Sequence, residues 1–268
     1  MIEVFKQSIA DSASIEEKIN RTRELLQTMI LSSLCDKKFF NNIAFLGGTA
    51  LRIVHKINRY SEDLDFSLID KTGYSFKRLN ETIVNFFKLN NILMETDPDD
   101  SKTVNSTFFK FTNILQLLGL SVAKNQKFAI KFEIDTNPPL GYSTENVHIS
   151  APNMFSLTAY DLPSMFAGKL HACHCRKYSK GRDYYDLMWY LGQKIKPNFL
   201  LLNNAIIQTE NQNLNINETN LTDFIYKVIE KVDLEAAAKD VKKFLFYPQE
   251  AEMLNKTAFD SLLKYYNQ

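Results

Sequence analysis

The chain has 268 residues, of which 45% are hydrophobic and 24% charged, and its formal net charge is +1. This composition excludes wholesale disorder, and the near-neutral charge gives no global basic field that would attract nucleic acid. Three cysteines do not indicate a disulfide framework, and no apolar run approaches the length of about 18 residues that a membrane span requires. The N-terminus also lacks a basic segment followed by an apolar one. We therefore expect a cytoplasmic protein with no membrane partner.

The first 150 residues mix helical and strand patterns. Hydrophobic spacing predicts a helix over 14–34, a strand within 41–48 that ends at two glycines, a short helix over 49–57, a strand over 63–69 and a helix over 75–90. Ser14 followed by Glu17 fits a capping box at the first helix. Two β-rich segments, 106–118 and 126–136, can pair as neighbours with Gly119 and residues 121–125 as their connection. The prolines of 137–143 end this pattern.

From about residue 152 the pattern becomes helical. Pro163 suits the first turn of a helix that runs to Tyr178, and a second helix starts near Arg182. Helical spacing returns at 221–232, 235–246 and 258–268, after a polar, Asn-rich loop over 209–222. The sequence thus predicts an α+β protein, with a mixed β-sheet core and flanking helices over residues 1–151 and an all-helical part over 152–268.

Two acids stand at the start of the strand over 63–69. Asp63 and Asp65 alternate with apolar residues, so on a strand their carboxylates share a face about 7 Å apart along the backbone. If the carboxylates converge to about 5 Å, their repulsion costs roughly 3 kcal/mol at an effective dielectric constant near 20. A divalent cation would offset this repulsion, and oxygen ligands are those that Mg²⁺ takes. Asp63 and Asp65 are therefore candidate ligands of Mg²⁺ or Mn²⁺.

The two glycines that precede this strand suit a phosphate group. Gly47 and Gly48 let the main chain approach a polyanion closely, and Thr49 opens a helix whose free N–H groups face the turn. Thr49 can also offer its hydroxyl. Either half alone is better explained by a simple turn or a solvated strand end, but together, in this order and spacing, the two halves predict a site for a metal-bound nucleoside triphosphate (NTP). The P-loop pattern G-x-x-x-x-G-K-[ST] is absent.

The segment GGTALRIVHKINRYSEDLDF resembles a known family. Its order of Gly-Gly-Thr, a short helix and Ser-x-Asp-x-Asp is similar to the signature of the nucleotidyltransferase superfamily, in the form typical of the AbiEii/AbiGii toxin family of type IV toxin–antitoxin and abortive-infection systems. The resemblance covers about residues 40–190 and implies the nucleotidyltransferase fold. It implies that Ser61 also binds the nucleotide. It further implies a third metal-binding carboxylate on a later strand, for which Glu133 is favoured, while Asp135 shares its direction and stays an alternative.

The same resemblance extends to the helical part. Lys169 looks like the catalytic and nucleotide-binding lysine of the family, and Asp183 looks like its later catalytic aspartate. A lysine beside a triphosphate would neutralise charge on the transferred group, and the aspartate would orient the lysine or act as a base. Asp186 lies on the same helix face as Asp183. This part would complete the active-site cleft, with a cationic rim from Arg176, Lys177 and Arg182.

The resemblance implies an Mg²⁺-dependent enzyme that transfers a nucleotidyl group from an NTP and releases pyrophosphate. It implies RNA, at the 3′ end of tRNA, as the acceptor and a cognate antitoxin protein as a partner. Two alternatives remain open: a nucleotidyltransferase acting on a small molecule or a protein, and a non-catalytic nucleotide-binding protein.

The stretch HACHC, residues 171–175, suggests zinc by composition. Four ligands within five helical residues cannot face one ion, and at best His171 and Cys175 share a helix face. No second pair of cysteines is present to complete a site, so a zinc site is not expected from the sequence.

Overall fold

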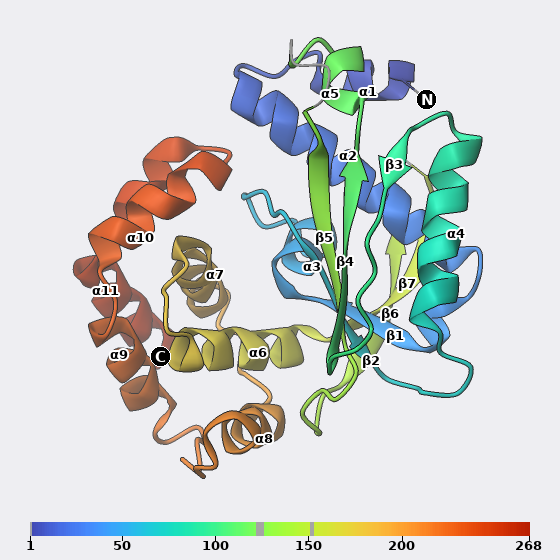
Figure 1. Ribbon diagram of the computed structural model, residues 1–268. Coiled ribbons are helices and arrows are strands. Elements are labelled where there is room, and N and C mark those ends of the chain that lie inside the picture. The colour runs from blue at the N-terminus through green and yellow to red at the C-terminus, as the bar shows by residue number, and fades with distance from the viewer. Residues whose placement is uncertain (1, 122–125, 151–152) are drawn as a thin grey trace. The chain divides into compact units, whose positions relative to one another are not determined.

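The computed structural model describes residues 2–121, 126–150 and 153–268, which form two compact units (Figure 1). The first unit extends to Lys56 and also contains Tyr60–Pro138 and Asn146–Ala159. The second contains Ile57–Arg59, Pro139–Glu145 and Tyr160–Gln268. The predicted boundary between residues 151 and 152, like most of the predicted connection over 121–125, lies outside the described residues.

The first unit contains a mixed seven-stranded sheet with the order β3-β4-β5-β2-β1-β7-β6. Its strands are β1 (Ile43–Leu46), β2 (Leu64–Leu68), β3 (Met94–Glu95), β4 (Val104–Phe111), β5 (Phe128–Asp135), β6 (Thr144–Ile149) and β7 (Phe155–Tyr160). Strand β2 is parallel to β5 and antiparallel to β1, while β4 and β5 pair antiparallel, as the sequence predicts for these neighbours. The acid-bearing strand β2 thus lies in the interior of the sheet.

Helices flank this sheet, and hydrophobic spacing predicts the second, third and fourth of them. They are α1 (Ile2–Ile9), α2 (Ile15–Cys35), α3 (Gly47–Ile53), α4 (Phe76–Leu89) and the one-turn α5 (Ile114–Leu117), with a 3₁₀ turn, η1, at Phe39–Asn41. At the start of α2, Ser14 Oγ accepts the Glu17 N–H at 3.1 Å. The Glu17 carboxylate accepts the N–H of Ala13, one residue earlier than in a capping box.

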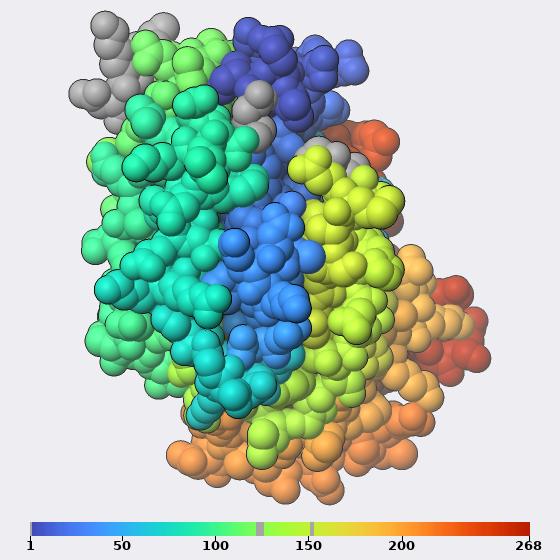
Figure 2. All heavy atoms as spheres, turned by 90° about the vertical axis from the view of Figure 1, so that its right-hand side faces the viewer, coloured from blue at the N-terminus to red at the C-terminus, as the bar shows by residue number. Residues whose placement is uncertain are grey.

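Aromatic packing fixes which face of β2 is buried. Phe66 of β2 lies 4.8 Å from Phe132 of β5 between ring centroids, and Phe76 of α4 lies 6.5 Å from Phe132. Helix α4 therefore covers the face to which these rings point, and its atoms are seen in teal in Figure 2. Because side-chain direction alternates along a strand, Asp65 points to the opposite face, away from this aromatic core.

The second unit is helical. It contains α6 (Leu162–Cys175), α7 (Gly181–Gly192), α8 (Phe199–Glu210), α9 (Leu221–Glu230), α10 (Leu234–Val241) and α11 (Lys256–Tyr266), with 3₁₀ turns η2 (Lys242–Phe244) and η3 (Pro248–Met253). The side chain of Asp161 caps α6, and Pro163 occupies its first turn as predicted. In the part of the chain that the structure describes, no helix has the length and apolar character needed to cross a membrane.

Several elements differ from the sequence prediction, among them α1, β3 and α8, which were not predicted. Strands β6 and β7 were not predicted, and β7 follows residue 152, so the first helix of the second unit begins only at Leu162. Strand β6 is mostly exposed and polar, which leaves no hydrophobic alternation to detect. The end of the β-rich segment 106–118 forms the helix α5 instead of strand, after β4 ends at Phe111.

Candidate active site

The sheet places two of the predicted acids on adjacent strands. Asp65 of β2 lies in register with Glu133 of β5 on one side and with Leu46 of β1 on the other. Neighbouring strands are about 4.8 Å apart and paired residues point to the same face, so the two side chains leave the sheet together. Asp63 comes two residues earlier, immediately before β2. All three acids are partly exposed.

The glycine turn lies directly against this acid strand. Strand β1 ends at Leu46, and Gly47 opens α3 with a φ of +80°, which favours glycine. A Cβ added at Gly47 would lie only 2.6 Å from Oδ2 of Asp65. The main chain of Gly47 and the carboxylate of Asp65 are therefore in close contact. The sequence showed only that the glycines precede the acids along the chain.

Thr49 joins the same two elements. It is fully buried, and its hydroxyl donates a hydrogen bond to the main-chain oxygen of Asp63. Its hydroxyl thus ties the start of α3 to the start of β2. The loop between these elements is fixed from another side, because Gln27 of α2 donates to the main-chain oxygens of Ser61 at 3.2 Å and Glu62 at 2.9 Å.

Glu133 and Asp135 differ in their surroundings, although both point the same way. Glu133 forms an ion pair with Lys131 at 2.8 Å and faces Asp65 across the strand pair. Asp135 lies in register with Ser67, and its carboxylate accepts the N–H of Asn137 at 2.9 Å. The first carboxylate is next to the acid motif, while the second caps the end of its own strand.

These residues fit a divalent metal ion and a phosphate group. Asp63, Asp65 and Glu133 offer the hard oxygen donors that Mg²⁺ and Mn²⁺ take. The Asp65 carboxylate can lie against the main chain of the turn because Gly47 has no Cβ. The N-terminus of α3 starts at the same glycine, and helix N-termini attract anions through their free N–H groups.

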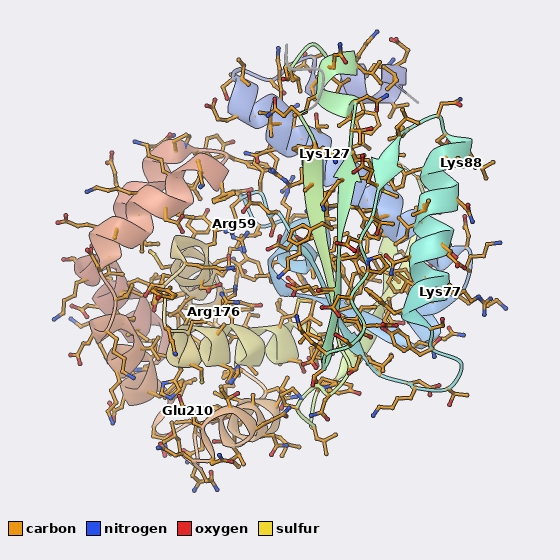
Figure 3. The ribbon with its side chains drawn as sticks, viewed as in Figure 1. Arg59, Lys77, Lys88, Lys127, Arg176 and Glu210 are labelled. Atoms are coloured by element: carbon orange, nitrogen blue, oxygen red, sulfur yellow. The ribbon has the colours of Figure 1, made fainter. Side chains whose placement is uncertain are left out.

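The predicted residues of the helical unit form a buried charge network. Lys169 Nζ of α6 lies 2.6 Å from Asp183 Oδ1 and 2.8 Å from Asp186 Oδ2, both on α7. Arg59 donates two hydrogen bonds to Asp186, at 2.5 and 2.6 Å, and Arg176 pairs with Asp183. Figure 3 labels the two arginines. The predicted shared face of Asp183 and Asp186 is thus confirmed, since both contact one lysine.

The network favours the charged forms of Lys169 and Asp183. Burial alone would lower the pKa of Lys169, but the carboxylates of Asp183 and Asp186 outweigh burial and raise it. Burial would raise the pKa of Asp183, but Lys169 and Arg176 lower it to about 2. Asp183 is therefore a poor proton acceptor at neutral pH and a good orienting group. Three cations and two carboxylates leave this set with one net positive charge, and the Arg176 side chain is 44% exposed.

Arg59 is the member of this network that the sequence did not predict. It belongs to the short segment Ile57–Arg59, which packs with the helical unit although the chain on either side of it belongs to the first unit. Its side chain is 1% exposed and Asp186 is fully buried. The available signal was an arginine four residues before the acid motif, which is too common to interpret alone. Of the predicted cationic rim, Lys177 is exposed, and Arg182 lies over the ring of Phe244 at 4.1 Å.

A sequence model described as nucleotidyl transferase AbiEii toxin of type IV toxin–antitoxin systems matches residues 29–264. The chain belongs to the AbiEii toxin family. This membership makes it an enzyme of the nucleotidyltransferase kind and confirms the resemblance. No curated protein matches the chain.

Two solved structures share the fold of this AbiEii family member. JHP933 from Helicobacter pylori has a TM-score of 0.54 at 16% identity and covers 92% of this chain and 93% of its own. A protein from the same organism, described as a candidate nucleotidyltransferase, has a TM-score of 0.53 at 17% identity and covers 91% of this chain and 95% of its own. The expected α+β nucleotidyltransferase fold is confirmed.

Replacing Gly47 by Ala tests the contact between glycine turn and acid strand. The positive φ costs about 1–2 kcal/mol, and the new methyl group displaces Asp65. We expect the rate of nucleotidyl transfer to fall about 100-fold, because displacing a reacting group by about 1 Å costs about that factor. Gly73→Ala is the matched control, because Gly73 has a φ of +72° but no heavy atom within 4 Å of an added Cβ. Equal loss of transfer in both variants would contradict the assignment of Gly47.

The charge network of this AbiEii chain predicts an acid-sensitive contribution to stability. The folded pKa of Asp183, about 2, lies below its ordinary value of 3.8. Such a group stabilises the fold above the unfolded pKa, and this stabilisation is lost as pH falls from about 4 to about 2. The loss should amount to about 2 kcal/mol in urea unfolding. Asp183→Asn should be less stable at neutral pH and lose less between pH 4 and 2. Parallel curves for both proteins would contradict this.

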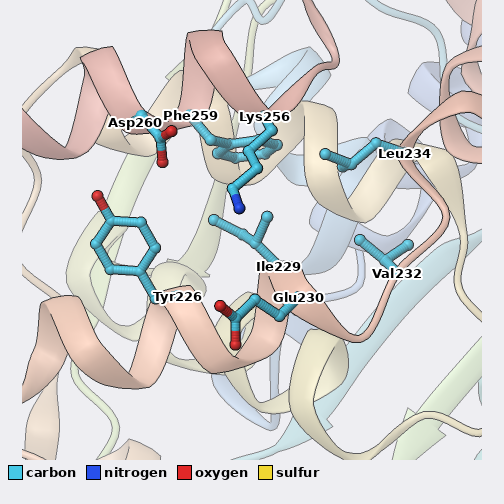
Figure 4. Close-up of a pocket in the computed structure, with 8 residues that line it drawn as sticks. All are labelled: Tyr226, Ile229, Glu230, Val232, Leu234, Lys256, Phe259 and Asp260. Atoms are coloured by element: carbon cyan, nitrogen blue, oxygen red, sulfur yellow. The ribbon is translucent and has the colours of Figure 1, made fainter.

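Two cavities of the helical unit are lined by other residues. One, of about 220 Å³, lies among eight residues of α9, the segment that follows it, α10 and α11, with Lys256 between Tyr226 and Glu230 (Figure 4). The other, of about 1080 Å³, is lined by residues that include Tyr185, Trp189 and Tyr265. Neither cavity is lined by Asp63, Asp65, Glu133 or the glycines of the turn.

Proposed function

We propose that this protein transfers a nucleotidyl group from an NTP to an RNA acceptor, with release of pyrophosphate. The supporting observation is the close contact between the main chain of Gly47 and the carboxylate of Asp65, which in turn lies in register with Glu133. A triphosphate needs main-chain N–H groups for its oxygens and hard oxygen ligands for its metal. Here one strand–helix turn and one strand pair supply both.

Each residue of the sheet has a distinct part in this proposal. Asp63, Asp65 and Glu133 would hold Mg²⁺, which when bound offsets negative charge on the phosphate that is transferred. Gly47, Gly48 and the N–H of Thr49 receive the triphosphate, and Ser61 borders the nucleotide. The carboxylates also orient the acceptor hydroxyl for in-line attack on the α-phosphate. The hydroxyl oxygen bonds to the α-phosphorus and its proton passes to solvent water, while the bond from that phosphorus to the bridging oxygen breaks and pyrophosphate leaves.

The helical unit contributes fixed charge. Lys169, kept ionised by Asp183 and Asp186, is proposed to offset charge that develops on the transferred group. Asp183 orients this lysine and does not act as a base, because its pKa is held near 2. Lys169→Met should therefore lower the rate more than it weakens NTP binding.

The acceptor and the partner are proposed from the resemblance to the family. We propose the 3′ end of tRNA as the acceptor, and an antitoxin protein as the partner that type IV systems imply. The near-neutral net charge means that RNA would be bound by a local basic surface.

Label transfer tests this function. The full chain is incubated with Mg²⁺, total RNA and each of the four NTPs, labelled either at the α-phosphate or at the γ-phosphate. If the protein transfers a nucleotidyl group to RNA, the RNA becomes labelled from the α-labelled NTP and not from the γ-labelled NTP. Ribonuclease then releases this label. Label that resists ribonuclease but is removed by protease, label in a small molecule, or transfer of the γ-label would each overturn the proposal.

Paired variants decide which acid is the third carboxylate. Glu133→Gln should lower transfer about 100-fold, because it removes a proposed metal ligand beside Asp65. Asp135→Asn should change transfer less than about threefold, because Asp135 caps its strand end through Asn137. Initial rates at saturating Mg²⁺ measure both. The reverse order would assign the role to Asp135.

A further inference from the structure

The end of α6 carries a second group of metal-ligating side chains. His174 and Cys175 occupy the last two positions of α6, and Glu210 is the last residue of α8. One ligand atom from each lies within 4.8 Å of both others, and His174 Nε2 is 3.3 Å from a carboxylate oxygen of Glu210. All three side chains are partly buried. Glu210 is labelled in Figure 3.

The surrounding contacts hold these ligands in place. One turn earlier on α6, His171 Nε2 is 2.9 Å from the hydroxyl of Thr209, the residue before Glu210. The ring of Phe224 on α9 lies 5.1 Å from that of His174 between centroids. Such contacts orient ligands before an ion arrives, and outer contacts of this kind tune metal affinity. The contact between His171 and Thr209 thus holds the last turn of α6 beside the last turn of α8, next to the proposed ligands.

The donor set selects the class of ion. One thiolate, one imidazole and one carboxylate suit Zn²⁺ and related transition metals, whereas Mg²⁺ and Ca²⁺ take oxygen ligands. Ligand atoms on a tetrahedral Zn²⁺ ion are roughly 3.5 Å apart, so small side-chain rotations bring this set to binding distance. Three protein ligands leave a fourth position for water.

We propose that His174, Cys175 and Glu210 form a site for Zn²⁺ that links the end of α6 to the end of α8. The site is separate from the metal ligands of the proposed transfer reaction and does not depend on that reaction. The sequence predicted no zinc site and placed only His171 and Cys175 on one helix face, because helical spacing alone cannot show a ligand 36 residues beyond His174. Helix α6 also carries Lys169, so the ion would stiffen the helix that positions this lysine.

Cobalt absorption tests the site on the full, reduced chain. Excess Mg²⁺ is present to occupy sites built from oxygen ligands, and Co²⁺ is added as the probe. A bound thiolate gives a sulfur-to-cobalt charge-transfer band, which Zn²⁺ should abolish by displacement. We expect this band in the wild-type chain, and a Zn²⁺ affinity at least about 100-fold lower in Cys175→Ser and in Glu210→Gln.

Matched variants separate this site from other sulfur ligation. Cys173→Ala removes the buried neighbouring sulfur, and Cys35→Ser removes the cysteine of the first unit. Both variants should keep the cobalt band, and Zn²⁺ should still raise their unfolding temperature. Cys175→Ser should lose both effects. No band in the wild-type chain, or a band that persists in Cys175→Ser, would overturn the proposal.

Discussion

Replacing Asp65 by Asn is expected to lower the rate of nucleotidyl transfer by at least about 10³-fold while the fold is retained. The amide keeps the shape of the side chain, so the contact with Gly47 remains. The substitution removes the negative charge with which Asp65 would bind the metal ion of the triphosphate. The measurement is the initial rate of transfer from an NTP labelled at the α-phosphate, with circular dichroism as a check on folding.

The control for this variant is Asp70→Asn. Asp70 follows the same strand but is exposed, and its carboxylate accepts the N–H of Thr72. Its replacement should leave transfer within about twofold of the wild-type rate. A normal rate in Asp65→Asn, or an equal loss in both variants, would remove Asp65 from the metal site.

Replacing Asp186 by Ala is expected to lower the free energy of unfolding by about 3–5 kcal/mol. Asp186 is fully buried and accepts two hydrogen bonds from Arg59, which is 1% exposed. The variant leaves a buried guanidinium without that partner, which costs several times more than loss of a surface ion pair. This is a large fraction of the roughly 5–15 kcal/mol that stabilises a typical domain. Urea unfolding at pH 7 measures it.

Two further variants test whether the loss of stability in Asp186→Ala comes from breaking its ion pair with Arg59. Asp223→Ala removes an exposed acid from the first turn of α9 and should cost less than about 1 kcal/mol. Arg59→Met combined with Asp186→Leu replaces both charges by apolar groups and should recover most of the stability. If the double variant is as unstable as Asp186→Ala, the loss does not come from the unpaired Arg59 but from packing or from Lys169, which also loses Asp186 as a partner.

Local pattern was enough to predict the acid strand and its glycine turn. The spacing of Asp63 and Asp65 on a strand follows from alternation alone, and the need for glycine follows from a phosphate site. The capped start of α2 and the proline-led start of α6 are likewise local signals. These elements are found in the structure close to their predicted bounds.

The features that the sequence did not predict depend on contacts between residues far apart in the chain. Arg59 meets Asp186 across 127 residues, and no local pattern connects them. The register that sets Glu133 beside Asp65 depends on a parallel pairing between distant strands. Strand β6 was missed because its residues are mostly exposed, and Glu210 could be joined to His174 only after α8 was packed against α6.

The most direct test is a crystal grown with Mn²⁺ and an NTP analogue that cannot be cleaved between the α- and β-phosphates. Anomalous scattering from Mn²⁺ locates the ion independently of the protein density. We predict an anomalous peak coordinated by Asp63 and Asp65, with phosphate oxygens at the N–H groups of Gly47 and Gly48. A bound analogue whose ion and phosphates lie away from these residues would contradict the account.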